Sequence, residues 1–159
     1  MFPMKALIRE IRDLLIRKKI TIALAESCTG GLISYSLTSV SGSSGYFKLA
    51  VIAYSNKAKE NILGIKRAIL NEKGAVSGEV ALNMAKAVKG LAKTDLGISI
   101  TGIAGPTGGS KLKPVGSVYI AIAGSAKTKT WRFKFRGSRE AIRKLATQKT
   151  LKLIKAWIA

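Results

Sequence analysis

The sequence contains no histidine and only one cysteine, Cys28. Hydrolases that depend on an imidazole base are therefore excluded, including every Ser-His-Asp and Cys-His arrangement. A single cysteine cannot form a disulfide within the chain, nor a zinc cage built from several thiolates. A nucleophile in this protein must therefore be activated by a lysine, a tyrosine or a carboxylate.

Acidic residues and long apolar runs are also scarce. Asp and Glu together number 8, and six of them stand far apart in the sequence: Glu26, Glu60, Glu72, Glu79, Asp95 and Glu140. This spacing predicts neither a metal site nor a catalytic pair of carboxylates. No apolar run is long enough to cross a bilayer, and the first residues lack the apolar centre of a signal peptide. We expect a cytoplasmic protein without metal, cofactor or membrane contact.

Basic and apolar residues are abundant instead. The 159 residues include 28 Lys and Arg, giving a formal net charge of +20, and 47% are hydrophobic. Such a chain is most simply one domain, residues 1–159, with a real core. The basic residues are spread over both ends and most loops, and aromatic residues make up only 6%. This distribution favours attraction of phosphate-bearing small molecules over binding of nucleic acid.

Apolar periodicity predicts alternating helices and buried strands. Helices are expected at residues 3–18, 32–39 and 77–93, with a short one ending at Gly64 and a final one capped by Ser138. Strands are expected at residues 21–25, 49–53, 96–100, 115–123 and 130–135, the last two forming a hairpin. This alternation is typical of an α/β protein, here a three-layer α/β/α sandwich with a mixed, mostly parallel sheet.

The stretch from Gly42 to Lys59 carries the side chains of a hydrolase that works without histidine. It begins with Ser43 and Ser44 in a small-residue loop, passes through an apolar run and leaves it at Tyr54. A serine needs a base within hydrogen-bond reach to act as a nucleophile. A lysine can be that base once burial or neighbouring cations lower its pKa from about 10.4.

The residues alone leave other nucleophiles open. Ser43 adjoins Ser44, and Ser27 lies where a strand meets a helix, as the serine of a nucleophile elbow does. Cys28 has no evident base and is expected to be a small buried apolar residue. Lys57 is expected to be a solvated charge.

Two glycine-rich loops follow predicted strands, where ligands bind in sheets of this kind. Thr29, Gly30 and Gly31 precede a helix, so their backbone N–H groups can face an anion. Tight packing of the strand against the helix explains these glycines equally well. The second loop runs from Thr101 to Gly109 and includes Gly102, and in it the backbone can approach a ligand closely.

Six segments carry a resemblance to a known family: Ala25-Glu-Ser-Cys-Thr-Gly-Gly31, Gly42-Ser-Ser44, Tyr54-Ser-Asn-Lys-Ala-Lys59, Gly74-Ala-Val-Ser77, Thr101-Gly-Ile-Ala-Gly-Pro106 and Lys113-Pro-Val-Gly116. In this order they resemble the CinA C-terminal domain, the nicotinamide-nucleotide amidase (nicotinamide mononucleotide deamidase) family. The resemblance runs from Thr21 to Arg143. It implies hydrolysis of the carboxamide of nicotinamide mononucleotide to nicotinic acid mononucleotide and ammonia, without a metal.

The resemblance also implies roles for individual residues. Ser44 is the nucleophile, Lys59 is the base, and Tyr54 relays a proton or holds the lysine. Substrate contacts fall on one hydroxyl, one arginine and the backbone of two loops: Thr101, Arg139, Thr29, Gly30, Gly31 and Gly102. This chain has Ser138 where the family more often has Asp, which leaves the register of the Arg139 loop open.

The implied catalytic set carries a geometric condition. If residues 48–54 form one strand, Ser44 and Tyr54 lie about 20 Å apart. The site then needs a folded-back loop, or residues from two subunits of a homodimer or higher oligomer. The alternative function is a non-catalytic basic domain that binds nucleic acid or nucleotides, and such a domain has no need of this serine, tyrosine and lysine.

Overall fold

Five strands form a single sheet in the order β2-β1-β3-β4-β5 in the computed structural model, which describes residues 2–159. β1 (Ile22–Glu26) lies between β2 (Phe47–Ile52) and β3 (Leu96–Gly102) and is parallel to both. β4 (Ser117–Ala123) pairs antiparallel with β3, and β5 (Thr128–Lys134) pairs antiparallel with β4. Four of the five strands thus run in one direction, which confirms the mixed, mostly parallel sheet.

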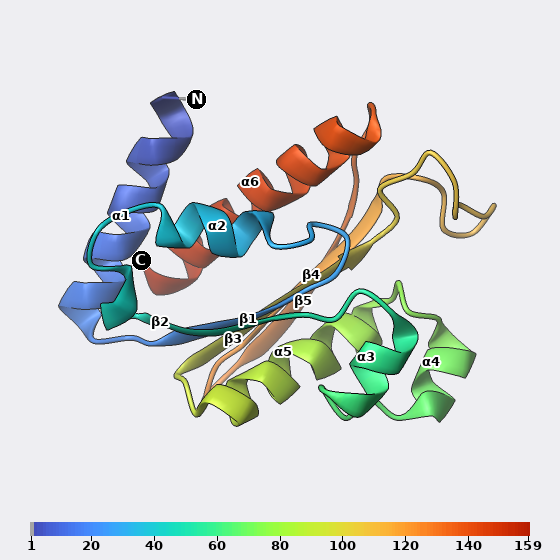
Figure 1. The fold of residues 1–159 in the computed structure, drawn as a ribbon, viewed down its shortest axis with the longest axis horizontal. Helices are drawn as coiled ribbons and strands as arrows, with labels where there is room; N and C mark the ends of the chain where they lie inside the picture. The colour runs from blue at the N-terminus through green and yellow to red at the C-terminus, as the bar shows by residue number, and fades with distance from the viewer. Residues whose placement is uncertain (1) are drawn as a thin grey trace.

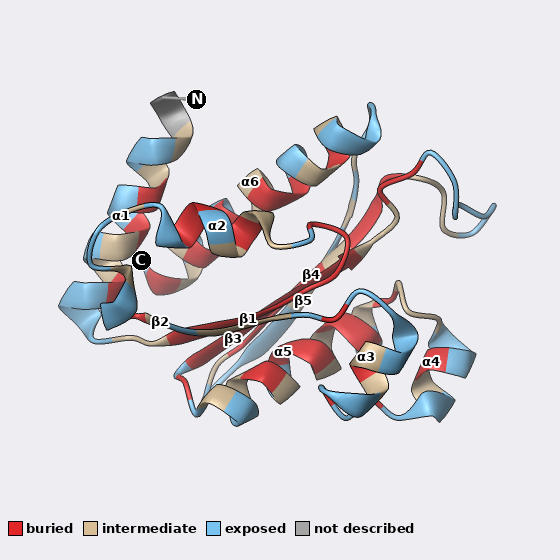
Figure 2. Cartoon of the chain, viewed as in Figure 1, coloured by how far each residue is buried: buried red, intermediate tan, exposed pale blue. Residues whose placement is uncertain are grey.

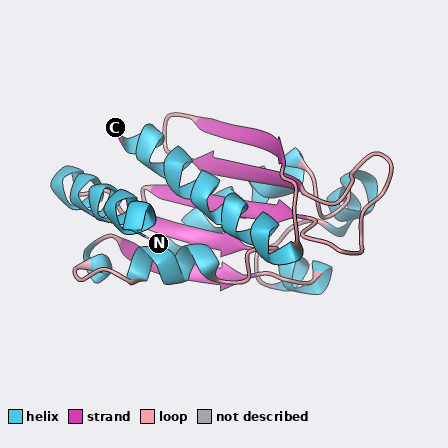
Figure 3. Ribbon diagram, turned by 90° about the horizontal axis from the view of Figure 1, so that it is seen from above, coloured by secondary structure: helices cyan, strands magenta, loops and turns pink. Residues whose placement is uncertain are grey.

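Helices cover both faces of this sheet (Figure 1). One face carries α1 (Phe2–Lys18), α2 (Leu32–Thr38) and α6 (Arg139–Ile158). The other carries α3 (Asn56–Asn61), α4 (Arg67–Lys73) and α5 (Gly78–Ala92). The predicted three layers are confirmed, and the view from above shows α6 lying across the strands (Figure 3). Within residues 2–159, no helix combines the length and the apolar character that crossing a membrane requires.

The predicted helix starts are confirmed at the level of single hydrogen bonds. Ser77 accepts a hydrogen bond from the Val80 N–H, and Ser138 accepts one from the Ala141 N–H. Each hydroxyl satisfies a backbone donor that the first turn of a helix leaves free. The sequence did not predict α4, because its seven residues bury only Leu70 and show no apolar period.

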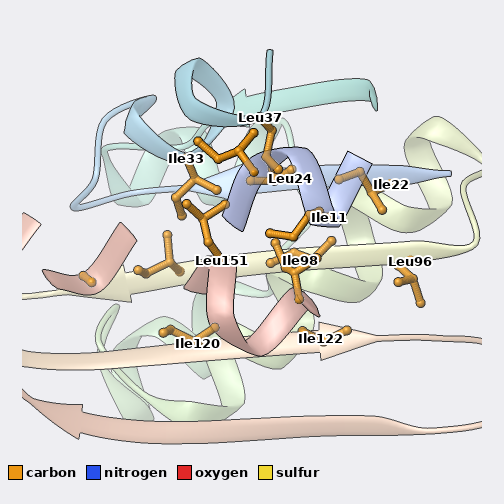
Figure 4. Close-up of a cluster of buried hydrophobic side chains, with 14 of the residues drawn as sticks. Ile11, Ile22, Leu24, Ile33, Leu37, Leu96, Ile98, Ile120, Ile122 and Leu151 are labelled. Carbon is orange, nitrogen blue, oxygen red and sulfur yellow. The ribbon is translucent and has the colours of Figure 1, made fainter. Parts of the chain in front are cut away.

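The main core lies between the sheet and α1, α2 and α6 (Figure 4). Leu24, Ile98 and Ile120 come from three neighbouring strands and pack with Ile11 and Leu151. The central strands are buried on both faces, whereas β2 and β5 at the edges are partly exposed (Figure 2). Because the centre of the sheet is so tightly held, the carboxyl ends of β1 and β3 have fixed positions.

The opposite face of the sheet meets α5 through small residues. Ala81 and Ala85 of α5 pack against Ala121 and Ala123 of β4. A Cβ atom added to Gly97 of β3 would lie 2.0 Å from the Ala85 carbonyl oxygen. Glycine is therefore required at this position by the close approach of helix and strand rather than by a turn.

Candidate active site

A pocket of about 210 Å³ lies at the carboxyl ends of β1, β2 and β3. Five residues expected to act in the site line it, Tyr54, Lys59, Thr101, Gly102 and Arg139. Ser27, Cys28 and Asn56 also line it. The pocket therefore gathers residues from five separate segments of the chain, at the carboxyl ends of the strands, where ligands bind in α/β sheets.

Lys59 is a buried lysine without a carboxylate partner. Its side chain is 2% exposed, and it is the one buried residue of α3. Its Nζ donates a hydrogen bond to the Ala53 carbonyl at 2.8 Å and lies 3.3 Å from Ser27 Oγ. None of the ion pairs among the described residues involves it. Burial lowers the pKa of Lys59 below its ordinary value of 10.5, so the neutral amine that a base requires is favoured.

Ser27 is the hydroxyl that meets this amine. It is the first residue after β1, and its N–H donates to the Ile100 carbonyl of β3. The residue is 8% exposed and lines the pocket. Ser27 and Lys59 therefore form a buried serine–lysine pair at the strand-to-helix turn, with Oγ and Nζ near hydrogen-bond distance.

The structure does not bring Ser44 and Lys59 together. Ser44 lies in the 3-10 turn η1 (Ser43–Gly45), before β2, and its carbonyl accepts a hydrogen bond from Lys48. The six residues of β2, a length of about 20 Å, separate this turn from the Ala53 carbonyl that holds Lys59. The described residues form no folded-back loop that would join the two side chains, and a site shared between two subunits would need a second copy of the chain.

The parallel pairing of β1 with β2 explains why Ser27 takes this place. Glu26 of β1 pairs with Ile52 of β2, and the Ala53 N–H donates to the Glu26 carbonyl. The residue that follows Glu26 therefore lies beside the residues that follow Ile52, where α3 begins. Neighbouring strands bring Ser27 to Lys59 although the sequence places Ser44 closer to it.

Glu26 occupies the position that an anionic ligand was predicted to take. Its carboxylate is fully buried and accepts five hydrogen bonds. The donors are the Thr29 hydroxyl at 2.6 Å, the N–H groups of Gly31 and Ile33, and the N–H and hydroxyl of Ser34. The group that accepts hydrogen bonds at the start of α2 is thus the side chain of Glu26 rather than a bound anion.

This arrangement uses, within the protein itself, the polar groups of the first glycine-rich loop that were expected to contact substrate. The hydroxyl of Thr29 and the N–H of Gly31 are committed to Glu26, and the N–H of Gly30 donates to the Ser27 carbonyl. None of the three lines the pocket. Thr29, Gly30 and Gly31 therefore shape the turn that carries Ser27.

Arg143 of α6 supports the same turn from the other side. Its Nε donates to the Cys28 carbonyl at 3.2 Å and its Nη2 to the Thr29 carbonyl at 2.8 Å. A guanidinium presents these donors in a fixed fork, so it can hold two successive carbonyl groups at once. Glu26 and Arg143 together hold the backbone that directly follows Ser27, from Cys28 to Ser34.

Cys28 is buried, as the sequence predicted, and its surroundings disfavour the nucleophilic thiolate. Burial raises the pKa of its thiol to about 12. The thiolate is the reactive form of cysteine, and at this pKa it is almost absent near neutral pH. Among the described residues, no group of three or more His, Cys, Asp and Glu side chains could hold a metal ion.

Tyr54 and Arg139 meet at the mouth of the pocket. Arg139 is the first residue of α6, and its guanidinium donates to the Tyr54 hydroxyl and to the Gly105 carbonyl, each at 2.7 Å. Tyr54 is 58% exposed, and its recorded partner is Arg139, whereas Lys59 is held by Ala53. In this structure the Tyr54 hydroxyl thus contacts Arg139 rather than Lys59.

Two further residues complete the lining. The Thr101 hydroxyl donates to the Ala75 carbonyl at 2.9 Å, so its oxygen can still accept a hydrogen bond from a ligand. Asn56, which sequence reasoning missed, begins α3 and lines the pocket with an exposed carboxamide. The signal that could have identified it is its place between Tyr54 and Lys59.

Replacing Glu26 by glutamine should destabilise the fold. A carboxamide cannot accept all five hydrogen bonds, and its NH₂ group would face other donors, so we expect the free energy of unfolding to fall by about 2–4 kcal/mol. Urea denaturation measures this change. The matched control is Glu79→Gln, an exposed glutamate in the first turn of α5, which should cost at most about 1 kcal/mol. Equal effects of the two variants would contradict the structural role given to Glu26.

Comparison with known proteins points to one family. The sequence matches the family model described as CinA C-terminal domain over residues 4–158. A CinA-like protein of Geobacter sulfurreducens is 52% identical over 126 residues, which cover 79% of this chain and 30% of that protein. A CinA-like protein of Syntrophus aciditrophicus is 46% identical over 150 residues, which cover 94% and 36%. The chain thus spans about a third of the length of the curated relatives it matches.

Solved structures share the whole fold. The competence/damage inducible protein CihA from Agrobacterium tumefaciens superposes with a TM-score of 0.93 at 34% identity, covering 96% of this chain and 94% of that chain. The competence-damaged protein (CinA) superfamily protein of Klebsiella pneumoniae gives a TM-score of 0.94 at 28% identity, covering 98% and 97%. These chains are similar to the present one over nearly all of its length.

Proposed function

Because the chain belongs to the CinA C-terminal domain family, we propose that it is an amidohydrolase that converts nicotinamide mononucleotide to nicotinic acid mononucleotide and ammonia. In this proposal Ser27 is the nucleophile and Lys59 the general base. The observation that carries it is the buried pair itself, with Nζ 3.3 Å from Oγ in a pocket lined by Tyr54, Thr101 and Arg139. A domain that only binds its ligand has no need of a lysine held this way.

In the first half of the reaction, neutral Lys59 accepts the proton of the Ser27 hydroxyl while Oγ attacks the carboxamide carbon. The oxyanion that forms needs a hydrogen-bond donor. The N–H of Cys28, the residue directly after Ser27, can serve as this donor. The lysine then passes its proton to the amide nitrogen, and the C–N bond breaks to release ammonia.

In the second half, the amine is neutral again and acts on water. Lys59 accepts a proton as a water oxygen attacks the acyl carbon, and the ester bond to Oγ breaks as Ser27 regains a proton. The sum is one carboxamide and one water converted to one carboxylic acid and one ammonia. The lysine ends the cycle as it began, so no group outside this chain has to supply or take up a proton.

The size of the pocket fits one end of the substrate. A volume of about 210 Å³ is below the range of about 300–1,000 Å³ typical of sites that enclose a whole drug-sized ligand. The pyridine ring with its carboxamide therefore enters the pocket, and the ribose and phosphate remain at the mouth. Arg139 lies at that mouth in the first turn of a helix, where a guanidinium and a helix N-terminus both favour an anion.

Release of ammonia from nicotinamide mononucleotide, together with formation of the acid mononucleotide, tests the proposed function. The purified chain should catalyse both with equal stoichiometry and without added metal. Absence of turnover at millimolar substrate would overturn the proposed activity.

Arg139→Met should raise KM for nicotinamide mononucleotide about tenfold and change kcat little, because a charge-assisted contact to phosphate is worth about 1.5–3 kcal/mol. The variant should also weaken the rise of KM with salt that a phosphate contact produces. Arg136→Met is the matched control, since it removes an exposed arginine of the same segment. If both variants change KM equally, Arg139 does not contact the phosphate.

A further inference from the structure

The two tryptophans of this protein lie together, and they lie far from the candidate active site. Trp131 belongs to β5 and Trp157 to α6, and their ring centroids are 6.2 Å apart at an interplanar angle of 76°. The ammonium of Lys127 lies 4.4 Å from the Trp157 ring centroid, and that of Lys129 lies 5.3 Å from the Trp131 ring centroid. Both lysines are exposed.

These side chains border two adjoining hollows. Lys127, Lys129, Trp131 and Trp157 line one of about 450 Å³. A neighbouring hollow of about 620 Å³ shares Thr128 with the first and is lined by three lysines from α5 and the residue after it, Lys86, Lys89 and Lys93. No carboxylate lines either hollow. We refer to these five lysines and two tryptophans as the Trp–Lys surface.

The Trp–Lys surface and Ser27 lie at opposite ends of the strands. Thr128 begins β5 and Ala123, which lines the second hollow, ends β4. The active-site pocket instead lies where β1 and β3 end. Figure 1 shows that these two ends of the sheet are separated by the length of the strands. A ligand of the Trp–Lys surface would thus leave the pocket free.

Asp95 is the acidic residue closest in sequence to Lys93, but it does not neutralise the lysines of this surface completely. Asp95 follows Thr94, which lines the second hollow, and its carboxylate accepts hydrogen bonds from the N–H and hydroxyl of Thr21. Those hydrogen bonds lower the pKa of Asp95, with a smaller contribution from Lys89. One carboxylate beside five lysines leaves a clear excess of positive charge.

We propose that the Trp–Lys surface binds single-stranded nucleic acid. Lysines without carboxylates attract a polyanion, and the exposed parts of the two half-buried tryptophan rings give unpaired bases a surface on which to stack. An acidic peptide would use the lysines but not the aromatic rings. The lysine ammonium is a compact charge and lacks the planar guanidinium with which arginine forms paired hydrogen bonds to base edges. The surface therefore binds without sequence preference. Basic and aromatic residues that are spread along the sequence are thus brought into one cluster by the fold.

Intrinsic fluorescence tests this proposal directly, because both tryptophans of the chain belong to the surface. A short oligothymidylate should quench the emission at low salt, with an affinity that falls as salt is added. The double variant Lys127→Ala/Lys129→Ala should weaken binding at least tenfold. Its slope of log K against log salt should be shallower by about 1.4, since two phosphate contacts are lost. Hydrolysis of nicotinamide mononucleotide should be unchanged in the variant.

The matched control is Lys5→Ala/Lys57→Ala, which removes the same charge from exposed positions elsewhere. It should bind the oligonucleotide almost as the unaltered protein does. Absence of quenching would overturn the proposal. An equal loss of affinity in the control would overturn it as well, because binding would then follow net charge. Equally strong quenching by polyglutamate of matched charge would identify an acidic peptide as the ligand instead.

Discussion

Ser27→Ala should reduce kcat/KM for amide hydrolysis at least about 10³-fold, the scale of loss when a covalent nucleophile is removed. The fold should be preserved. The Ser27 hydroxyl has one recorded partner, Lys59, which keeps its hydrogen bond to the Ala53 carbonyl in the variant. We therefore expect the free energy of unfolding to change by no more than about 1 kcal/mol. Steady-state kinetics of ammonia release and urea denaturation measure the two quantities.

Ser44→Ala is the control for this prediction. Ser44 lies before β2, and its recorded hydrogen bond uses the main-chain carbonyl, which alanine retains. Its kcat/KM and stability should therefore match those of the unaltered protein. Loss of activity in this variant, with activity kept in Ser27→Ala, would contradict the arrangement and require a site formed between two subunits.

The second large effect is expected at Lys59. Lys59→Met should reduce kcat/KM by about 10²–10⁴-fold, the usual contribution of a general base. Lys59→Arg should lose activity equally, although it keeps a positive charge, because a guanidinium does not deprotonate in this range. Lys57→Met, the exposed neighbour, should be nearly silent. An arginine variant with a close to normal rate would show that Lys59 is only a positive anchor.

The pH dependence follows from the direction in which burial moves the pKa of Lys59. In the unaltered protein, kcat/KM should rise with pH along a limb whose apparent pKa lies below 10.5, as the amine becomes neutral. Between the lowered folded-state pKa and the unfolded value, the unfolded chain binds more protons than the folded one. The free energy of unfolding should therefore increase with pH across that interval. Lys59→Met should lack this increase, which denaturation at several pH values would reveal.

Most of the fold could be predicted because its signals are local. Apolar periodicity and capping hydroxyls such as Ser77 and Ser138 located the long helices, and short apolar runs located the five strands. The helix α4 escaped prediction because seven residues with one buried side chain, Leu70, carry no period. Local signals of this kind depend only on a window of sequence, so they do not require knowledge of which strands are neighbours.

The site was predicted only in part because catalysis depends on those neighbours. Lys59, Tyr54 and Arg139 were expected in the site and do line the pocket, whereas Ser44, the serine that the resemblance implied, does not, and Ser27 had been left open as an alternative. The pairing of Glu26 with Ile52 across two strands brings Ser27 there instead. Nothing in a linear sequence specifies that register. The two tryptophans likewise belong to separate elements, which only the packing of α6 beside β5 brings together.

The most direct test of the catalytic assignment is peptide mapping after an acid quench during turnover of nicotinamide mononucleotide. An ester formed with the serine should be preserved in acid. We expect the added mass of the nicotinic acid mononucleotide acyl group on the peptide that contains Ser27, in the unaltered protein and in Ser44→Ala. Ser27→Ala should carry no adduct and release no ammonia above background. An adduct on the peptide that contains Ser44, or full hydrolysis by Ser27→Ala, would contradict the account.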